Sequence, residues 1–176
     1  MNCKIEGCNK QASGKSKYCK EHAKIAREKW LAMIEAQKQE KQEKLDNFKR
    51  IWDKAVQAGR EALNRCTPTP MVVQQHASPL DDNSPVVQQW SAPGGVCGFA
   101  WVNVSPGNCS FANWLKKNKL AGKAYYGGVD IWVREGGQSY ERKMEFARAM
   151  AKVLNENRDT LAMPKAGRIY ASGRLD

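Results

Sequence analysis

Residues 3–22 read CKIEGCNKQASGKSKYCKEH, and this stretch sets the expectation for how the chain begins to fold. It holds three cysteines and a histidine in the spacing Cys-x4-Cys-x10-Cys-x2-His, namely Cys3, Cys8, Cys19 and His22. Three thiolates and one imidazole form a ligand set that holds zinc in closed tetrahedral sites. Because protein would fill all four positions, no position is left for a reacting water. The pattern therefore predicts a structural zinc site and not a catalytic one.

The segment around these ligands, residues 1–22, is rich in glycine, lysine and serine and has no apolar pattern. A segment of this size needs a staple because it cannot bury enough apolar surface to fold alone. We therefore expect residues 1–22 to form a zinc knuckle that depends on its metal for folding.

Residues 3–30, CKIEGCNKQASGKSKYCKEHAKIAREKW, resemble the short zinc knuckle of phage-encoded DNA-binding and HNH-endonuclease-associated proteins. The resemblance implies zinc at the four ligands and DNA association through a basic surface. It does not imply the nuclease, because an HNH site needs a pair of histidines and the only other histidine is His76. Residues 95–176 look like an uncharacterised phage module, which implies a source but no activity.

The charge of the chain is strongly positive and unevenly distributed. The formal net charge is +11, made up of +7 in residues 1–65, −2 in residues 66–94 and +6 in residues 95–176. Two basic ends are typical of nucleic-acid-binding proteins, although an anionic protein partner or simple solubility explains them equally well. We expect phosphate contacts from nine residues: Lys10, Lys15, Lys17, Lys20, Lys24, Arg27, Arg134, Arg142 and Lys143.

Residues 23–65 are predicted to form one long helix or two collinear ones. One apolar stripe comprises Ile25, Trp30, Met33 and Ile34, and a second comprises Leu45, Phe48, Ile51, Trp52, Val56 and Leu63. The stretch between them, residues 35–44, is polar on all sides and is expected to be a solvated bridge. The second stripe should pack on the C-terminal domain or on another copy of the helix, which would make a homodimer.

Residues 66–94 are predicted to be a linker, because five of the seven prolines lie there among serine, glutamine and asparagine. The sequence Val-Val-Gln-Gln occurs twice, at residues 72–75 and 86–89. Two copies are too few for a repeat fold, so we attribute them to chance or to two short extended pieces on the domain surface.

Residues 95–176 are predicted to form a small α+β domain in the order β-α-β-α-β, with helices on one face of a sheet. The strands are expected at 96–104, 125–133 and 167–171, and the helices at 110–119 and 138–157. Trp101 and Trp114 are expected in its core.

Two further chemical readings of this domain need testing. Asp130 and the Glu141-Arg142-Lys143 sequence superficially match magnesium nucleases, but Glu141 falls in a predicted helix and not on an adjacent strand. Gly136-Gly137 before that helix could bind an anion beside Tyr125, Tyr126 and Trp132, giving a face for single-stranded nucleic acid. A tight turn with aromatics filling a small core is the simpler explanation.

The remaining sequence features concern compartment and partners. The N-terminus has no signal-type apolar segment, and no apolar run would span a membrane, so a cytoplasmic protein is expected. Cys66, Cys97 and Cys109 are predicted to be free thiols, the latter two buried. The expected partner is nucleic acid, most simply DNA bound without catalysis, and the alternative partner is a host or virion protein.

Overall fold

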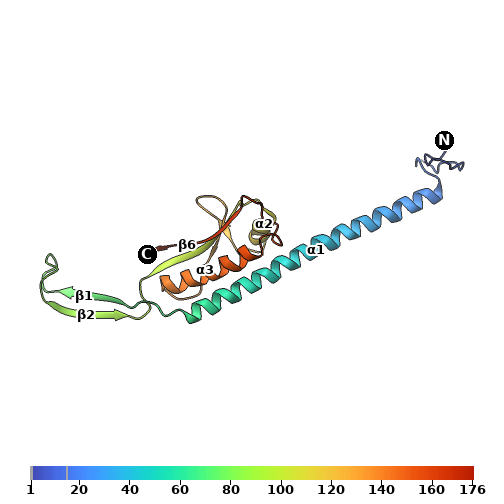
Figure 1. Ribbon diagram of the computed structural model, residues 1–176. Coiled ribbons are helices and arrows are strands. Elements are labelled where there is room, and N and C mark those ends of the chain that lie inside the picture. The colour runs from blue at the N-terminus through green and yellow to red at the C-terminus, as the bar shows by residue number, and fades with distance from the viewer. Residues whose placement is uncertain (1, 15) are drawn as a thin grey trace. The chain divides into compact units, whose positions relative to one another are not determined.

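The computed structural model describes residues 2–14 and 16–176 and confirms a mixed α+β fold (Figure 1). The chain divides into two compact units, Met1–Leu45 and Asp46–Asp176. The first helix, α1, runs from Lys20 to Arg65 and therefore contributes to both. Among the described residues, no helix is long and apolar enough to cross a membrane.

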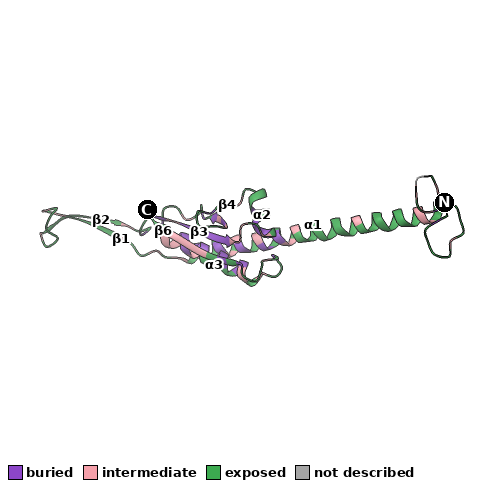
Figure 2. Ribbon diagram, turned by 90° about the horizontal axis from the view of Figure 1, so that it is seen from above, coloured by how far each residue is buried: buried purple, intermediate pink, exposed green. Residues whose placement is uncertain are grey.

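The first unit consists of turns followed by the N-terminal part of α1. A single antiparallel bridge joins Asn2 to Gln11, and the helix begins where the amide of Ala23 donates to the carbonyl of Cys19 at 2.9 Å. The first apolar stripe is largely exposed, including Trp30 and Met33, and the buried residues of α1 begin only at Phe48. Figure 2 shows the resulting run of exposed residues along this part of α1. The first unit therefore has almost no apolar core.

In the second unit, the C-terminal part of α1 buries one side of the helix. Its buried residues recur every three or four positions: Phe48, Ile51, Ala55, Gly59 and Leu63. The Phe48 ring packs edge-on against Phe111 at 5.5 Å, and a Cβ on Gly59 would lie 2.8 Å from the Phe146 ring. Of the two predicted packing modes for the second stripe, the structure shows packing within the C-terminal domain.

The core of the second unit lies beneath a four-stranded antiparallel sheet of order β4-β5-β3-β6. The strands are β3 (Gly98–Ser105), β4 (Gly122–Lys123), β5 (Val129–Trp132) and β6 (Arg168–Leu175), and the helices are α2 (Ser110–Lys117) and α3 (Tyr140–Glu156). The predicted β-α-β-α-β order is confirmed, with the short β4 added. The second strand begins at Val129 and not Tyr125, because Gly127 and Gly128 both adopt positive φ and bend the chain there.

The stretch predicted to be a linker contains a two-stranded antiparallel ribbon instead. Strand β1 (Met71–His76) pairs with β2 (Val86–Ala92), so that Gln74 faces Gln89 and Gln75 faces Gln88. The Gln74 side chain donates to that of Gln89 at 3.0 Å. The two Val-Val-Gln-Gln copies are therefore extended, as one alternative held, and their glutamines pair with each other, whereas Val72 and Val73 pair with Ser91 and Trp90. The prolines of this stretch lie before, between and after the two strands and do not interrupt them, which is why proline content misled the prediction.

Candidate metal centre

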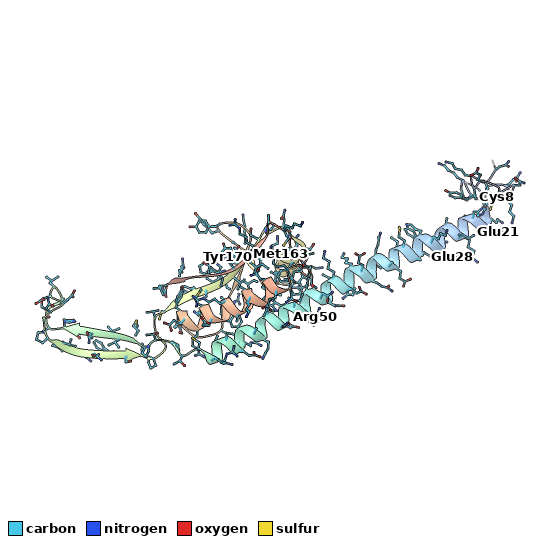
Figure 3. All side chains as sticks on the ribbon, viewed as in Figure 1. Cys8, Glu21, Glu28, Arg50, Met163 and Tyr170 are labelled. Atoms are coloured by element: carbon cyan, nitrogen blue, oxygen red, sulfur yellow. The ribbon has the colours of Figure 1, made fainter. Side chains whose placement is uncertain are left out.

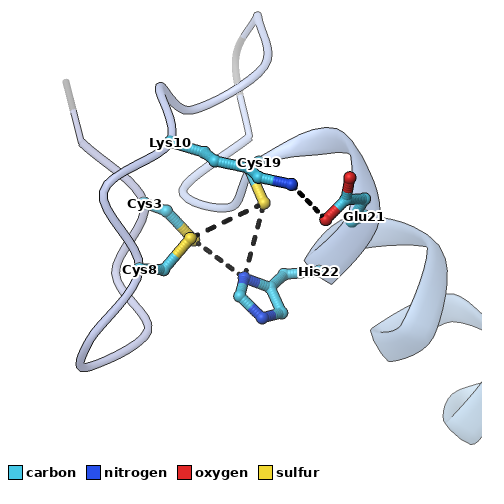
Figure 4. Close-up of polar contacts among 6 residues, drawn as sticks. All are labelled: Cys3, Cys8, Lys10, Cys19, Glu21 and His22. Carbon is cyan, nitrogen blue, oxygen red and sulfur yellow. Dashed lines mark hydrogen bonds and ion pairs between the residues drawn. The ribbon is translucent and has the colours of Figure 1, made fainter.

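The four predicted ligands come together at the N-terminal end of α1 (Figure 4). One ligand atom from each of Cys3, Cys8, Cys19 and His22 lies within 4.8 Å of all the others. Within residues 2–14 and 16–176, this is the only group of three or more cysteine, histidine, aspartate or glutamate residues that could hold a metal ion. The cluster predicted from spacing is thus present in the structure.

The distances between these atoms fit a tetrahedral metal. The Nδ1 of His22 lies 3.3 Å from the Sγ of Cys3 and 3.4 Å from that of Cys19, and the Sγ atoms of Cys8 and Cys19 are 4.0 Å apart. Bonds of about 2.3 Å to sulfur and about 2.05 Å to nitrogen imply ligand separations of about 3.8 Å (S to S) and about 3.6 Å (S to N) in a tetrahedron. The ligand set needs only small adjustments to hold zinc.

Backbone geometry places the ligands. Gly7 adopts a φ of +80° between Cys3 and Cys8, a conformation that glycine tolerates without steric cost. The amide of Cys8 donates to the carbonyl of Ile5 at 3.1 Å, which turns the chain so that both thiols face the same point. Cys19 stands immediately before α1 and His22 lies in its first turn, so the helix start fixes the other two ligands.

The thiols differ in acidity. Backbone amides of Cys19 and Ile5 directed at the sulfur lower the pKa of Cys3 from 9.0 to about 6. At Cys8 the amide of Lys10 also lowers the pKa, but burial and the neighbouring thiols of Cys3 and Cys19 outweigh it, so the pKa is raised. Cys3 is therefore more readily present than Cys8 as the thiolate that a metal requires.

The basic residues predicted around the cluster differ in their surroundings. Lys10 forms a 2.6 Å ion pair with Glu21, which raises the pKa of Lys10 and lowers that of Glu21 (Figure 4). A larger group is exposed to solvent: Lys17, Lys20, Lys24 and Arg27. Lys15 lies outside the described residues. Lys20, Lys24 and Arg27 on the first turns of α1, together with Lys17 just before the helix, form a cationic surface next to the candidate metal site.

Two of the three residues of the second unit that were predicted to contact phosphate are not fully exposed to solvent. Lys143 is only 6% exposed, and its ammonium donates to the carbonyl of Gly98 at 2.8 Å. Arg142 is half-buried and directs Nε to the carbonyl of Leu63 at 3.4 Å. Arg134 is exposed. Lys143 is thus a buried cation that stabilises the backbone, a role its position in an otherwise amphipathic helix did not reveal.

The alternative nuclease reading gains nothing from the geometry. Asp130 lies on β5, where its Oδ1 accepts from Asn103 at 2.7 Å. Glu141 lies on α3, as expected, and accepts from the amide of Thr69 at 2.8 Å. Neither belongs to a metal-ligating group among the described residues. The helix after Gly136-Gly137 is capped by its own Ser139, whose Oγ accepts from the amide of Arg142 at 3.5 Å.

Several expected core residues lie nearer the surface. Cys97 is exposed and not buried, and the half-buried Cys109 caps α2, where its sulfur accepts from the amide of Ala112 at 3.4 Å. Trp114 is half-buried and stacks on Phe111 at 5.8 Å. Trp101 is half-buried on the sheet face away from the helices.

No family model matches the chain, and searches of curated proteins and of solved structures find no match.

Proposed function

We propose that the protein is a phage-encoded, zinc-containing, non-catalytic DNA-binding protein of the host cytoplasm, with the zinc knuckle as its contact region. The observation that carries the proposal is the gathering of four soft ligands within 4.8 Å, beside exposed lysines at the start of α1. The resemblance to phage zinc knuckles supports the source and the polymer. Reduced thiols suit a cytoplasmic setting.

In this proposal the metal has a structural role. Zinc would be held by Cys3, Cys8, Cys19 and His22, and its chemistry when bound is to lock the turns of residues 2–19 onto α1. The chain's own lysines then contact phosphate. Lys17, Lys20 and Lys24 are exposed, and each phosphate contact releases condensed counterions. Binding should therefore weaken as salt rises, with a slope of about −0.9 per phosphate contacted.

Metal content by mass spectrometry, combined with an electrophoretic shift of duplex DNA before and after chelation, tests the proposal. We expect one zinc per chain and loss of the shift after chelation, with recovery when zinc is returned. Lys20→Gln/Lys24→Gln should weaken binding and flatten the salt slope. Lys38→Gln/Lys41→Gln is the matched control, because it removes two exposed lysines further along the same helix.

Two results would contradict the proposal. If the chain bound DNA equally well with and without metal, the zinc knuckle would not be the region that contacts DNA. Equal weakening by both lysine pairs would indicate a general charge effect without a defined site.

A second candidate, binding of a host or virion protein, is favoured by the β1-β2 ribbon. Neither strand contains a charged residue, and five apolar side chains are exposed on it: Val72, Val73, Val86, Val87 and Trp90. Uncharged apolar surface of this kind is typical of protein interfaces. The test is a partner that binds the intact protein but not Val73→Lys, with DNA binding unchanged in that variant.

A further inference from the structure

One face of the four-stranded sheet is turned away from α3. A Cβ on Gly173 would lie 2.7 Å from the sulfur of Met144 in α3, and one on Gly98 would meet Tyr140 of the same helix. Gly98, Ala100 and Val102 therefore face the helix. Since side chains alternate along a strand, the odd-numbered residues of β3 face the opposite way.

Aromatic side chains occupy this opposite face. Phe99 and Trp101 lie on β3, and Trp132 lies beside Trp101 on β5. Tyr170, labelled in Figure 3, lies opposite Asn103 on β6. The Trp132 ring is 5.0 Å from Trp101 and 6.3 Å from Phe99. Trp132 and Tyr170 are 46% and 47% exposed. Exposed apolar patches of this kind mark interaction or ligand-binding sites on protein surfaces.

Cations accompany the aromatic rings. Arg168 and Arg174 are exposed on β6 in the same alternation, and the guanidinium of Arg174 lies 5.4 Å from the centre of the Phe99 ring. Trp132 also lines a cleft of about 690 Å³, whose other lining residues include Lys116, Lys119 and Arg134. Of its two carboxylates, Glu135 is paired with Arg60, whereas Asp130 accepts from the neutral amide of Asn103 and keeps its charge. Arg168, Arg174, Lys119 and Arg134 outnumber this one carboxylate, so the charge next to the aromatics favours an anionic ligand.

A loop with two more aromatics borders the patch. Asn103, on the same face, donates to the carbonyl of Gly127 at 3.2 Å, which holds the loop of residues 124–128 at this end of the sheet. Tyr125 and Tyr126 in that loop are 92% and 95% exposed, with ring centres 4.9 Å apart. Neither tyrosine is buried by the rest of the second unit, so packing within this unit does not explain their presence in the loop.

We propose that this face, made of Phe99, Trp101, Trp132 and Tyr170 with Arg168 and Arg174, binds single-stranded nucleic acid. Flat rings on a sheet stack against bases that are unpaired, and the neighbouring cations contact the backbone phosphates. Duplex DNA does not suit this face, because its base faces are already stacked on one another. The occupant is a single strand of DNA or RNA, since stacking depends on the base and not on the sugar.

This inference deepens the proposed function, on which it rests, by adding a second site with a different preference. The knuckle would contact phosphates of a duplex, and the sheet face would hold bases of an unpaired strand. The two sites share no residue, so they fail separately in an experiment.

Fluorescence anisotropy of labelled oligo(dT) and oligo(U) of about twelve nucleotides, added to the zinc-loaded full chain, tests the inference. Trp132→Ala and Tyr170→Ala should each weaken binding by about 5- to 150-fold, as expected for removal of one stacked base. Trp132→Phe keeps a ring and should retain most of the affinity. Trp90→Ala is the matched control, since Trp90 is 47% exposed but lies on the β1-β2 ribbon.

Thermal unfolding of each variant separates lost stacking from lost fold. Unchanged affinity in Trp132→Ala and Tyr170→Ala would overturn the inference, as would equal weakening by Trp90→Ala. A sheet face that binds neither oligonucleotide but drives a dimer, lost in Trp132→Ala on sedimentation, would show a protein interface instead and would also overturn it. The variant Lys20→Gln/Lys24→Gln should lose duplex binding and keep oligo(dT) binding, because the two sites are separate.

Discussion

The two units of this chain keep their folds by different means. In the second unit the largest side chains that are almost fully buried include Phe48, Phe111 and Leu154, and the sheet and helices close around them. In the first unit the two cysteines Cys3 and Cys19 are the buried residues among those described, and most apolar residues of α1 there are exposed, with Ile34 and Leu45 half-buried. One unit rests on the hydrophobic effect, whereas the other has four side chains that could hold a metal ion and almost no apolar core of its own. Each should therefore respond to perturbations that leave the other unchanged.

Removal of the metal should have the largest effect. Chelation, or Cys19→Ser, should unfold the turns of residues 2–14 and 16–19 completely, because apparent binding energies of about 10–16 kcal/mol stabilise structural zinc sites at neutral pH. Amide spectra should lose dispersion for this segment while signals of Asp46–Asp176 stay in place. Cys66→Ser serves as the control, since this thiol lies outside the cluster. If the amide signals of the first unit stayed dispersed after chelation, this unit would not depend on a metal for its fold.

Acid should act on the same unit. The pKa of Cys3 is lowered from 9.0 to about 6, so its thiolate favours the folded form above pH 9, and that contribution is lost as the pH falls through about 6. Protons also compete with the metal for all three thiolates. We expect the affinity for zinc to fall as the pH is lowered, and more steeply once the pH is below about 6, where Cys3 is also protonated. Competition with a zinc indicator at a series of pH values measures this, and an affinity independent of pH would contradict ligation by thiolates.

A core truncation should act on the second unit. Phe111 is fully buried and contacts Phe48 and Trp114, so Phe111→Ala should lower the free energy of unfolding by about 3–5 kcal/mol. Urea titration measures this. Trp30→Ala, at a ring 56% exposed in the first unit, should change it little. Equal effects of the two variants would mean that the apolar stripes do not differ in role.

Gly59→Ala tests the close approach of α1 to α3. Alanine normally stabilises a helix by about 1 kcal/mol relative to glycine. Here the new Cβ would lie 2.8 Å from three atoms of the Phe146 ring, and overpacking costs about 1–3 kcal/mol. We expect net destabilisation in urea titration. Adding Phe146→Leu should recover part of it by making room, whereas a stabilised single variant would show that the helices simply separate.

Loss of the α3 cap should have the smallest effect. Ser139→Ala removes the oxygen that accepts from the amide of Arg142 and should cost about 1 kcal/mol. Ser139→Thr keeps a hydroxyl and should cost less. Chemical denaturation of both variants beside the wild type measures the difference, and identical midpoints would show that the 3.5 Å contact contributes nothing.

The features predicted correctly from sequence are those governed by local spacing. The candidate metal cluster was predicted from the spacing of Cys3, Cys8, Cys19 and His22. Short loops between ligands keep their side chains close enough to meet at one point. The periodicity of α1 and α3 follows equally from apolar residues three and four positions apart. The Ser139 cap was also predicted correctly, because it joins residues only three positions apart, within one helical turn.

The features that were missed depend on contacts between distant residues. Composition alone assigned the β1-β2 ribbon to a linker, because Gln74 and Gln89 show their pairing only when the chain turns back. Trp101 was expected in the core, but the register of β3 with β5 and β6 decides which face of the sheet it occupies. Lys143 lies on a helix face that periodicity marks as buried, yet nothing in the sequence indicated that the carbonyl of Gly98 would accept from it.

The register of β3 with β6 has a kinetic consequence. It pairs Gly98 with Leu175 and Ser105 with Arg168. The hydrogen bonds of β3 on this side therefore form only when residues about 60 to 80 positions further along the chain have come into place. The metal ligands all lie between Cys3 and His22. Closing a short loop takes about 10–100 ns, whereas folding slows as contacting residues become more distant in sequence. On dilution from denaturant with zinc present, metal capture should come first, and the tryptophan signal of the completed sheet should follow as a separate, slower phase.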